Sequence, residues 1–167
     1  MFQILNCNKI NSKGFVLIEV LIAVALISIV FVTLLGISFL VVNVSSSIQK
    51  ETQADSLAKE ELEAVRNFRD GTKWTTTGLG VVNTGSNNVY HMVNSSNKWT
   101  LASGVETTGI FTRGIVFDKV SRDSSTQNIE TSYNSTHDDA DTRKVTVTVS
   151  WSGKTIQDIL YLTNWAQ

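Results

Sequence analysis

The sequence of 167 residues contains no proline, a single cysteine and almost no net charge. One cysteine excludes a disulfide framework within the chain and a cysteine-rich zinc site. The formal charge of −1 lacks the basic surplus that a nucleic-acid-binding domain normally carries, so nucleic acid is not an expected partner. The length fits one small domain and leaves no room for a multidomain enzyme.

Charge is absent above all from residues 20–42, an apolar run of 23 residues. A helix needs about 20 apolar residues to cross the hydrocarbon core of a bilayer, whereas the apolar region of a cleaved secretory signal has only about 7–15. Lys9 and Lys13 precede the run, and no basic residue follows it until Lys50. This asymmetry predicts a single-pass membrane protein whose N-terminus is cytoplasmic and whose remaining chain lies outside.

One carboxylate, Glu19, interrupts the start of the apolar segment. Ionisable groups inside membrane helices are costly and usually face a partner. If the chain is cut between Gly14 and Phe15, the new amino group lies one helical turn from Glu19. That amine can neutralise Glu19 within one subunit or bind the Glu19 of a neighbour. The alternative is a carboxylate near the membrane surface that snorkels or stays protonated.

The segment KGFVLIE at positions 13–19, followed by a long apolar helix, resembles the class III signal of type IV prepilins. The resemblance implies that residues 1–14 are a leader, with Lys9 and Lys13 as its basic residues. A prepilin peptidase would then cut after Gly14 and methylate Phe15, and Glu19 would serve assembly. Cleavage there would also remove the single cysteine.

Strong helix formers continue the apolar segment, and Gly71 stands where a helix end is expected. We therefore predict a membrane and filament-core helix over 15–44, an amphipathic continuation over 45–71 and a globular domain over 72–167. Gly36 and the serines at 45–47 are the predicted weak points of the helix. The predicted packing face consists of Leu57, Ala58, Leu62, Val65 and Phe68.

The clearest strand covers 143–151, where valines and Trp151 alternate with polar residues, and Ser152-Gly153 follows as a turn. Further strands are predicted near 90–93, 99–102, 109–120 and 155–163, with Arg113 at an exposed edge. The predicted fold class is α+β. As in type IV pilins, a long N-terminal helix, its apolar half transmembrane, packs on a small antiparallel sheet of three or four strands.

A looser similarity to minor pilins of the PilV-like group covers 57–71, 144–154 and 162–165. The function implied is a structural subunit of a type IV pilus or related filament at the cell surface. Its partners would be other pilin subunits, the peptidase and the inner-membrane assembly platform, with membrane lipid around the helix before assembly. The alternatives are a pseudopilin of a type II-like secretion or DNA-uptake system and a single-pass surface binding module.

Residues with catalytic or metal-binding chemistry are few. Asp138, Asp139 and Asp141 form the one acidic cluster, but they lack EF-hand spacing, so a solvated turn is favoured over a calcium site. No Gly-x-Ser-x-Gly elbow is present, and no acid and histidine stand at a useful spacing. We therefore predict no catalytic residue and no cofactor. The four tryptophans are predicted to be mainly core residues.

Overall fold

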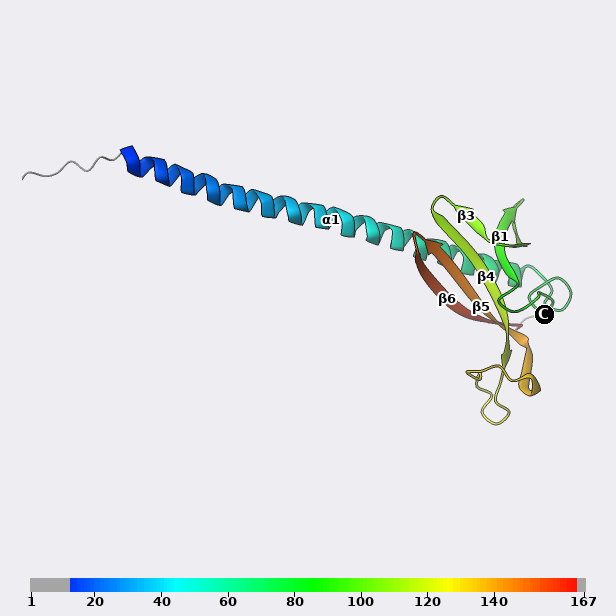
Figure 1. The fold of residues 1–167 in the computed structure, drawn as a ribbon. Coiled ribbons are helices and arrows are strands. Elements are labelled where there is room, and N and C mark those ends of the chain that lie inside the picture. The colour runs from blue at the N-terminus through cyan, green and yellow to red at the C-terminus, as the bar shows by residue number, and fades with distance from the viewer. Residues whose placement is uncertain (1–12, 165–167) are drawn as a thin grey trace, which may run out of the picture. The chain divides into compact units, whose positions relative to one another are not determined.

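The computed structural model describes residues 13–164, with side chains from Val16 onward. Cys7, Lys9 and Trp165 therefore lie outside the described residues, as does most of the predicted leader. The described chain is one long helix followed by strands, in an α+β layout (Figure 1). It divides into two compact units, Met1–Gln49 and Lys50–Gln167.

The first described element, α1 (Lys13–Asp70), is an unbroken α-helix that includes Gly36 and the serines at 45–47. Its hydroxyl groups in the apolar part are satisfied within the helix. The Ser28 hydroxyl donates to the Val24 carbonyl at 2.7 Å, and the Ser38 hydroxyl to that of Leu34 at 2.9 Å. Such bonds lower the desolvation cost of a polar side chain in an apolar environment.

Helix α1 ends at Asp70, where Gly71 was predicted to stop it. The Gly71 amide donates to the Asn67 carbonyl at 2.9 Å, and the Thr72 hydroxyl donates to the Phe68 carbonyl at 2.6 Å. These bonds supply partners to the last carbonyls, which have none inside the helix. The chain then turns through a segment in which Trp74 is buried.

Six antiparallel strands follow the helix (Figure 1). They are β1 (Val89–Ser95), β2 (Lys98–Ser103), β3 (Glu106–Thr108), β4 (Phe111–Ser121), β5 (Asp138–Trp151) and β6 (Lys154–Thr163), with a short 3₁₀ helix at Ser135–His137. The order in the sheet is β2-β1-β4-β5-β6, and β3 also pairs with β4. The predicted helix and antiparallel sheet are confirmed, but three or four strands was too low a number.

Two-residue turns join the hairpins. Ser152 and Gly153 connect β5 to β6 with φ values of 46° and 78°, and Ser96 and Asn97 connect β1 to β2 with 53° and 61°. Two consecutive positive φ values match the right-handed twist of the flanking strands. The predicted turn at Ser152-Gly153 is therefore confirmed, and it fixes the register of β5 against β6.

The core lies between one face of the sheet and residues 54–68 of α1. The alternation predicted for β5 is confirmed, because Val145, Val147 and Val149 are fully buried. The buried helix face differs from the predicted one, since Leu57 and Leu62 are only half-buried. It consists of Ala54, Ala58, Glu61, Ala64, Val65 and Phe68.

Two predictions about the sheet need correction or completion. Arg113 is not at an exposed edge, because β4 pairs with β5 on one side and with β1 and β3 on the other, and its side chain is buried. Trp74 and Trp151 are core residues, as predicted, whereas Trp99 is half-buried and packs at the margin of the core.

Candidate functional site

The predicted processing site lies in the first turns of α1. The backbone of Lys13, Gly14 and Phe15 is helical, and Glu19 follows Phe15 by four residues. At 1.5 Å per residue this spacing is about 6 Å along the helix axis. Glu19 is exposed, and no ion pair engages it within the part of the chain that the structure describes. Its carboxylate is thus open to a group from outside the described chain.

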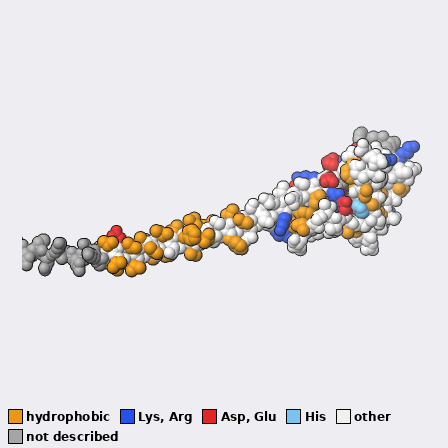
Figure 2. Space-filling model, turned by 90° about the horizontal axis from the view of Figure 1, so that it is seen from above, with side chains coloured by type: hydrophobic (Ala, Val, Ile, Leu, Met, Phe, Trp, Pro, Cys, Tyr) orange, Lys and Arg blue, Asp and Glu red, His pale blue; other side chains and the backbone are white. Residues whose placement is uncertain are grey.

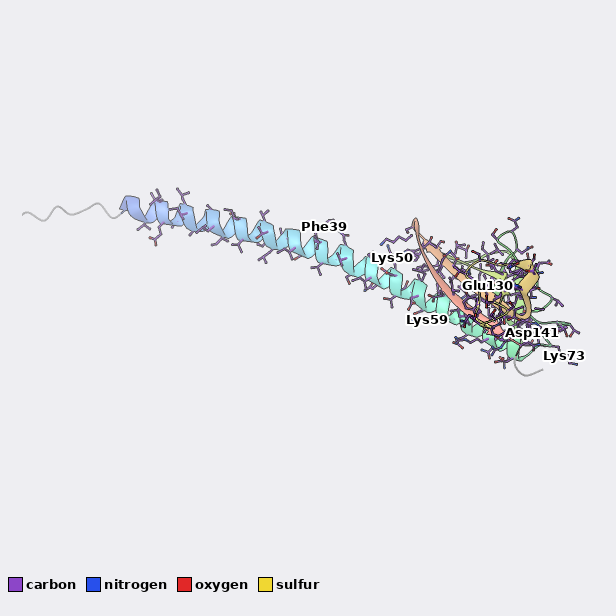
Figure 3. All side chains as sticks on the ribbon, turned by 90° about the horizontal axis from the view of Figure 1, so that it is seen from below. Phe39, Lys50, Lys59, Lys73, Glu130 and Asp141 are labelled. Carbon is purple, nitrogen blue, oxygen red and sulfur yellow. The ribbon has the colours of Figure 1, made fainter. Side chains whose placement is uncertain are left out.

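The apolar surface after Glu19 has no cover of its own. Every large apolar side chain from Val16 to Ile48 is at least 48% exposed, and Phe39 is 73% exposed (Figure 3). Figure 2 shows the hydrophobic side chains covering this part of the helix. Within the described residues, α1 is the helix that is long and apolar enough to cross a membrane. Such a surface requires lipid or protein around it.

A second carboxylate on α1, that of Glu61, is completely buried. Its Oε1 accepts a hydrogen bond from the Met92 amide at 2.7 Å, and its Oε2 lies 3.2 Å from Arg113 Nε in an ion pair. These contacts tie the helix to β1 and β4. Burial raises the pKa of Glu61, and the Met92 amide and the Arg113 charge oppose that rise only in part.

Arg113 is the centre of this buried network. Besides Glu61, its guanidinium contacts Glu106 of β3 at 2.6 Å and Glu60 of α1 at 3.3 Å. Burial acts against the charged form, but the carboxylates of Glu61 and Glu106 outweigh it, so the pKa of Arg113 is raised. Arg113 therefore stays cationic and holds the helix, the β3–β4 hairpin and β1 in one register.

Sequence reasoning missed Glu61, although the pattern contained a signal. Positions 54, 58, 61, 65 and 68 follow the spacing of one helical stripe, and four of the five are apolar. A single carboxylate inside such a stripe is buried with the stripe and needs a cationic partner. Arg113 lies at the same alternate positions of its predicted strand as Phe111, Ile115 and Phe117, so it shares their apolar face. This pattern indicated Arg113 as the partner.

The acidic cluster is not the solvated turn that was predicted, because Asp138, Asp139 and Asp141 belong to β5. Each binds a different partner: the Asp138 carboxylate accepts from the Tyr133 hydroxyl, that of Asp139 pairs with Arg122 at 2.6 Å, and that of Asp141 accepts from the Asn164 amide. Among residues 13–164, no three His, Cys, Asp or Glu side chains are arranged to hold a metal ion.

The residues with functional chemistry therefore fall into two groups on α1. Gly14, Phe15 and Glu19 lie at the start of the exposed apolar segment, and Glu61 lies in the core with Arg113. Comparison of the chain with protein-family models, with curated proteins and with solved structures finds no match in any of the three.

Proposed function

We propose that this protein is a structural subunit, of the minor-pilin kind, of a type IV pilus or a related filament. The chain is made as a prepilin, inserted with its N-terminus in the cytoplasm and cut between Gly14 and Phe15. Phe15 is then methylated, and the helix leaves the lipid to pack against the helices of other subunits. In this proposal the protein is the substrate of a peptidase and is not itself an enzyme.

One observation carries the proposal: an exposed apolar helix has a lone carboxylate four residues after a Gly-Phe pair. Glu19 is the single charged residue between positions 16 and 49. A carboxylate in such a segment needs a cation, and the amine created by cleavage lies within one turn of it. In a filament the same carboxylate can take the amine of a neighbouring subunit, which would set the register between two helices.

The proposal also accounts for the exposed apolar surface of the helix, which would be covered first by lipid and then by other subunits. Before assembly, lipid covers the helix, since residues 20–42 extend about 34 Å and the hydrocarbon core is about 30 Å thick. After assembly, apolar helices of other subunits cover the same side chains. The folded unit Lys50–Gln167 would remain outside the membrane at both stages.

Mass spectrometry of the N-terminus of the protein purified from its native host tests the proposal. We expect the chain to begin at Phe15 and to carry one added methyl group. A Gly14→Leu variant should keep Met1 and accumulate in the membrane, because the peptidase site is lost while the spanning segment is intact. A wild-type chain that still begins at Met1 would contradict the proposal and would favour a single-pass surface binding module.

A further inference from the structure

A polar cavity of about 360 Å³ lies at one end of the sheet, within the folded unit Lys50–Gln167. Small-molecule sites have volumes of roughly 300–1,000 Å³, so this cavity suits a ligand of one or two small rings. Its lining comes from three strands and two loops. The lining includes Gly85, Asp118, Lys119, Ser121, Glu130, Tyr133, Lys144 and Tyr161.

The floor of the cavity is a row of three residues on the face of the sheet opposite the core. Asp118 of β4 is paired in register with Lys144 of β5, and Lys144 with Tyr161 of β6. Neither Asp118 nor Lys144 makes a side-chain hydrogen bond or ion pair with any described residue. Tyr161 is 44% exposed. The floor thus offers a donor, an acceptor and an aromatic face.

The wall is a loop that the sheet holds in place. The Ser121 carbonyl accepts from the Glu130 amide at 2.9 Å, and the Ser121 hydroxyl accepts from the Asn134 amide at 2.9 Å. Tyr133 is 47% exposed, and its hydroxyl donates to the Asp138 carboxylate at 3.0 Å. The loop that contains Gly85 forms a second wall of the cavity. It is also held by the sheet, because the Gly85 amide donates to the Phe117 carbonyl at 2.8 Å. The cavity is therefore largely preformed.

Glu130 gives this wall a charged acceptor (labelled in Figure 3). Its Oε1 lies 3.0 Å from His137 Nδ1, and its Oε2 is buried. The Ser121 hydroxyl and the His137 ring hold the pKa of Glu130 below its usual range, so the carboxylate is ionised at neutral pH. An ionised carboxylate has lone pairs for more than one hydrogen bond, so it favours a ligand that donates hydrogen bonds.

The balance of charge and aromatic groups identifies the ligand class. Two acids, Asp118 and Glu130, face two bases, Lys119 and Lys144, so the lining has no cationic surplus to bind a phosphate. The exposed rings of Tyr133 and Tyr161 form no ring pair with another described aromatic residue. Aromatic faces bind the C–H faces of a sugar ring, and the charged groups and hydroxyls bind its OH groups.

We propose that this cavity is a binding site for a neutral saccharide of one or two rings. The sugar ring stacks on Tyr161, its hydroxyls donate to Asp118 and Glu130, and Lys144 donates to one of its oxygens. No described residue of α1 lines the cavity. A filament subunit with this site would attach to glycans, but saccharide binding does not depend on filament assembly and is tested on its own.

The experiment measures saccharide binding to the full chain in phosphatidylcholine nanodiscs, which carry no sugar headgroup. The probes are cellobiose, maltose, lactose and diacetylchitobiose, followed by saturation-transfer NMR. We expect at least one probe to bind with a Kd of about 1 mM. Tyr161→Ala should weaken that binding by about tenfold, and Tyr161→Phe, which keeps the ring, by less than about threefold.

Ile159→Ala is the matched control, because Ile159 is exposed on the same face of β6 and does not line the cavity. It should leave binding unchanged. Lys144→Ala gives a second loss-of-binding variant should Tyr161→Ala unfold, as judged by tryptophan fluorescence. Three results would overturn the proposal: no probe binds at about 10 mM, Ile159→Ala weakens binding as much as Tyr161→Ala, or inorganic phosphate binds while the sugars do not.

Discussion

Glu19 and Glu61 are two carboxylates on one helix, and their surroundings differ in kind. Glu61 is buried, accepts a hydrogen bond from the Met92 amide and forms an ion pair with Arg113. Glu19 is exposed, and no described residue forms an ion pair with it. The chain thus supplies the partners of the carboxylate in its folded unit. For the carboxylate in the apolar segment, the proposed function takes the partner from processing or from another subunit.

The helix surface around the two carboxylates shows the same difference. Residues 54–68 bury one face against the sheet, whereas the large apolar side chains from Val16 to Ile48 are exposed throughout. Burial of apolar area is the main favourable contribution to folding and to association. The folded unit has already gained that contribution within one chain. The apolar segment gains it only from lipid or from other helices, which is why we propose that this segment takes part in assembly.

The largest expected effect follows from replacing the open carboxylate. Glu19→Ala should abolish incorporation into filaments, because the amine of Phe15 then has no carboxylate to bind. Membrane insertion should continue, since removal of a charge makes the segment more apolar. The measurement compares the mutant subunit in sheared filaments and in membranes of the native host by immunoblotting. The folded unit should keep the melting temperature of the wild type.

Glu19→Asp sharpens this test, because it retains the charge on a side chain one methylene shorter. We expect partial incorporation, between that of the wild type and that of Glu19→Ala. If Glu19→Ala enters filaments at the wild-type level, the pairing of Glu19 with the Phe15 amine is wrong, even where cleavage after Gly14 is found.

The second largest effect concerns the buried carboxylate and appears as lost stability. Glu61→Ala leaves Arg113 with Glu60 and Glu106 alone and the Met92 amide without an acceptor. Breaking a buried ion pair in this way should cost about 3 kcal/mol of the free energy of unfolding. Urea unfolding of the full chain, followed by tryptophan fluorescence, measures the cost. All four tryptophans follow Gly71 and therefore report on the folded unit.

Glu63→Ala is the matched control, because Glu63 is exposed on the same helix and pairs only with Arg66 within one turn. Its effect on stability should be close to zero, as for most exposed ion pairs. Equal losses for Glu61→Ala and Glu63→Ala would mean that the buried network contributes no more than a surface pair.

Local patterns in the sequence predicted the elements of the fold that have a regular periodicity or a recognisable end signal. The alternation from Val145 to Trp151 gave β5, the Ser152-Gly153 pair gave its turn, and the helix formers before Gly71 gave the end of α1. β3 was missed because it contains only Glu106, Thr107 and Thr108, which have no apolar alternation. Its pairing with β4 is a contact between strands that composition alone does not reveal.

The candidate sites were predicted less evenly. Gly14, Phe15 and Glu19 form a local motif, so a single sequence was enough to single them out. Glu61 and Arg113 are 52 positions apart in the sequence, and their pairing depends on how the helix is placed on the sheet. The lining of the proposed saccharide site includes Lys119 and Val120, and the register between β4 and β5 shifts between these two residues, so that Val120 pairs with Asp139. No short-range pattern predicts such a shift.

A smaller effect is expected in the pH dependence of stability. Burial raises the pKa of Glu61 in the folded state, so folding favours its protonated form. The raised pKa of Glu61 therefore contributes stability. This contribution is complete below the pKa of the carboxyl group in the unfolded chain, about 4.3, and it is lost as the pH rises through the pKa of Glu61 in the folded protein. The stability of the wild type relative to Glu61→Gln should therefore increase from pH 7 toward pH 4.

Parallel urea titrations of the two proteins across this pH range make the measurement. Asp139 and Glu130 have lowered pKa values, and their contributions fall as the pH falls. These two contributions change equally in the wild type and in Glu61→Gln, however, so they cancel in the difference in stability between the two proteins. A difference that decreases on acidification would mean that the charge of Arg113, and not burial, determines the pKa of Glu61.

The smallest effect is expected where an ion pair lies on the surface of the folded unit. Lys59 Nζ is 2.7 Å from the Asp55 carboxylate, but both side chains are well exposed. Water and salt screen such a pair, and holding two long side chains together costs entropy, so little stability is gained. Asp55→Asn should leave the midpoint of urea unfolding within the experimental error. Since Glu61→Ala removes a charge from the same helix, the contrast would show that burial, and not charge itself, makes a carboxylate on α1 important for stability.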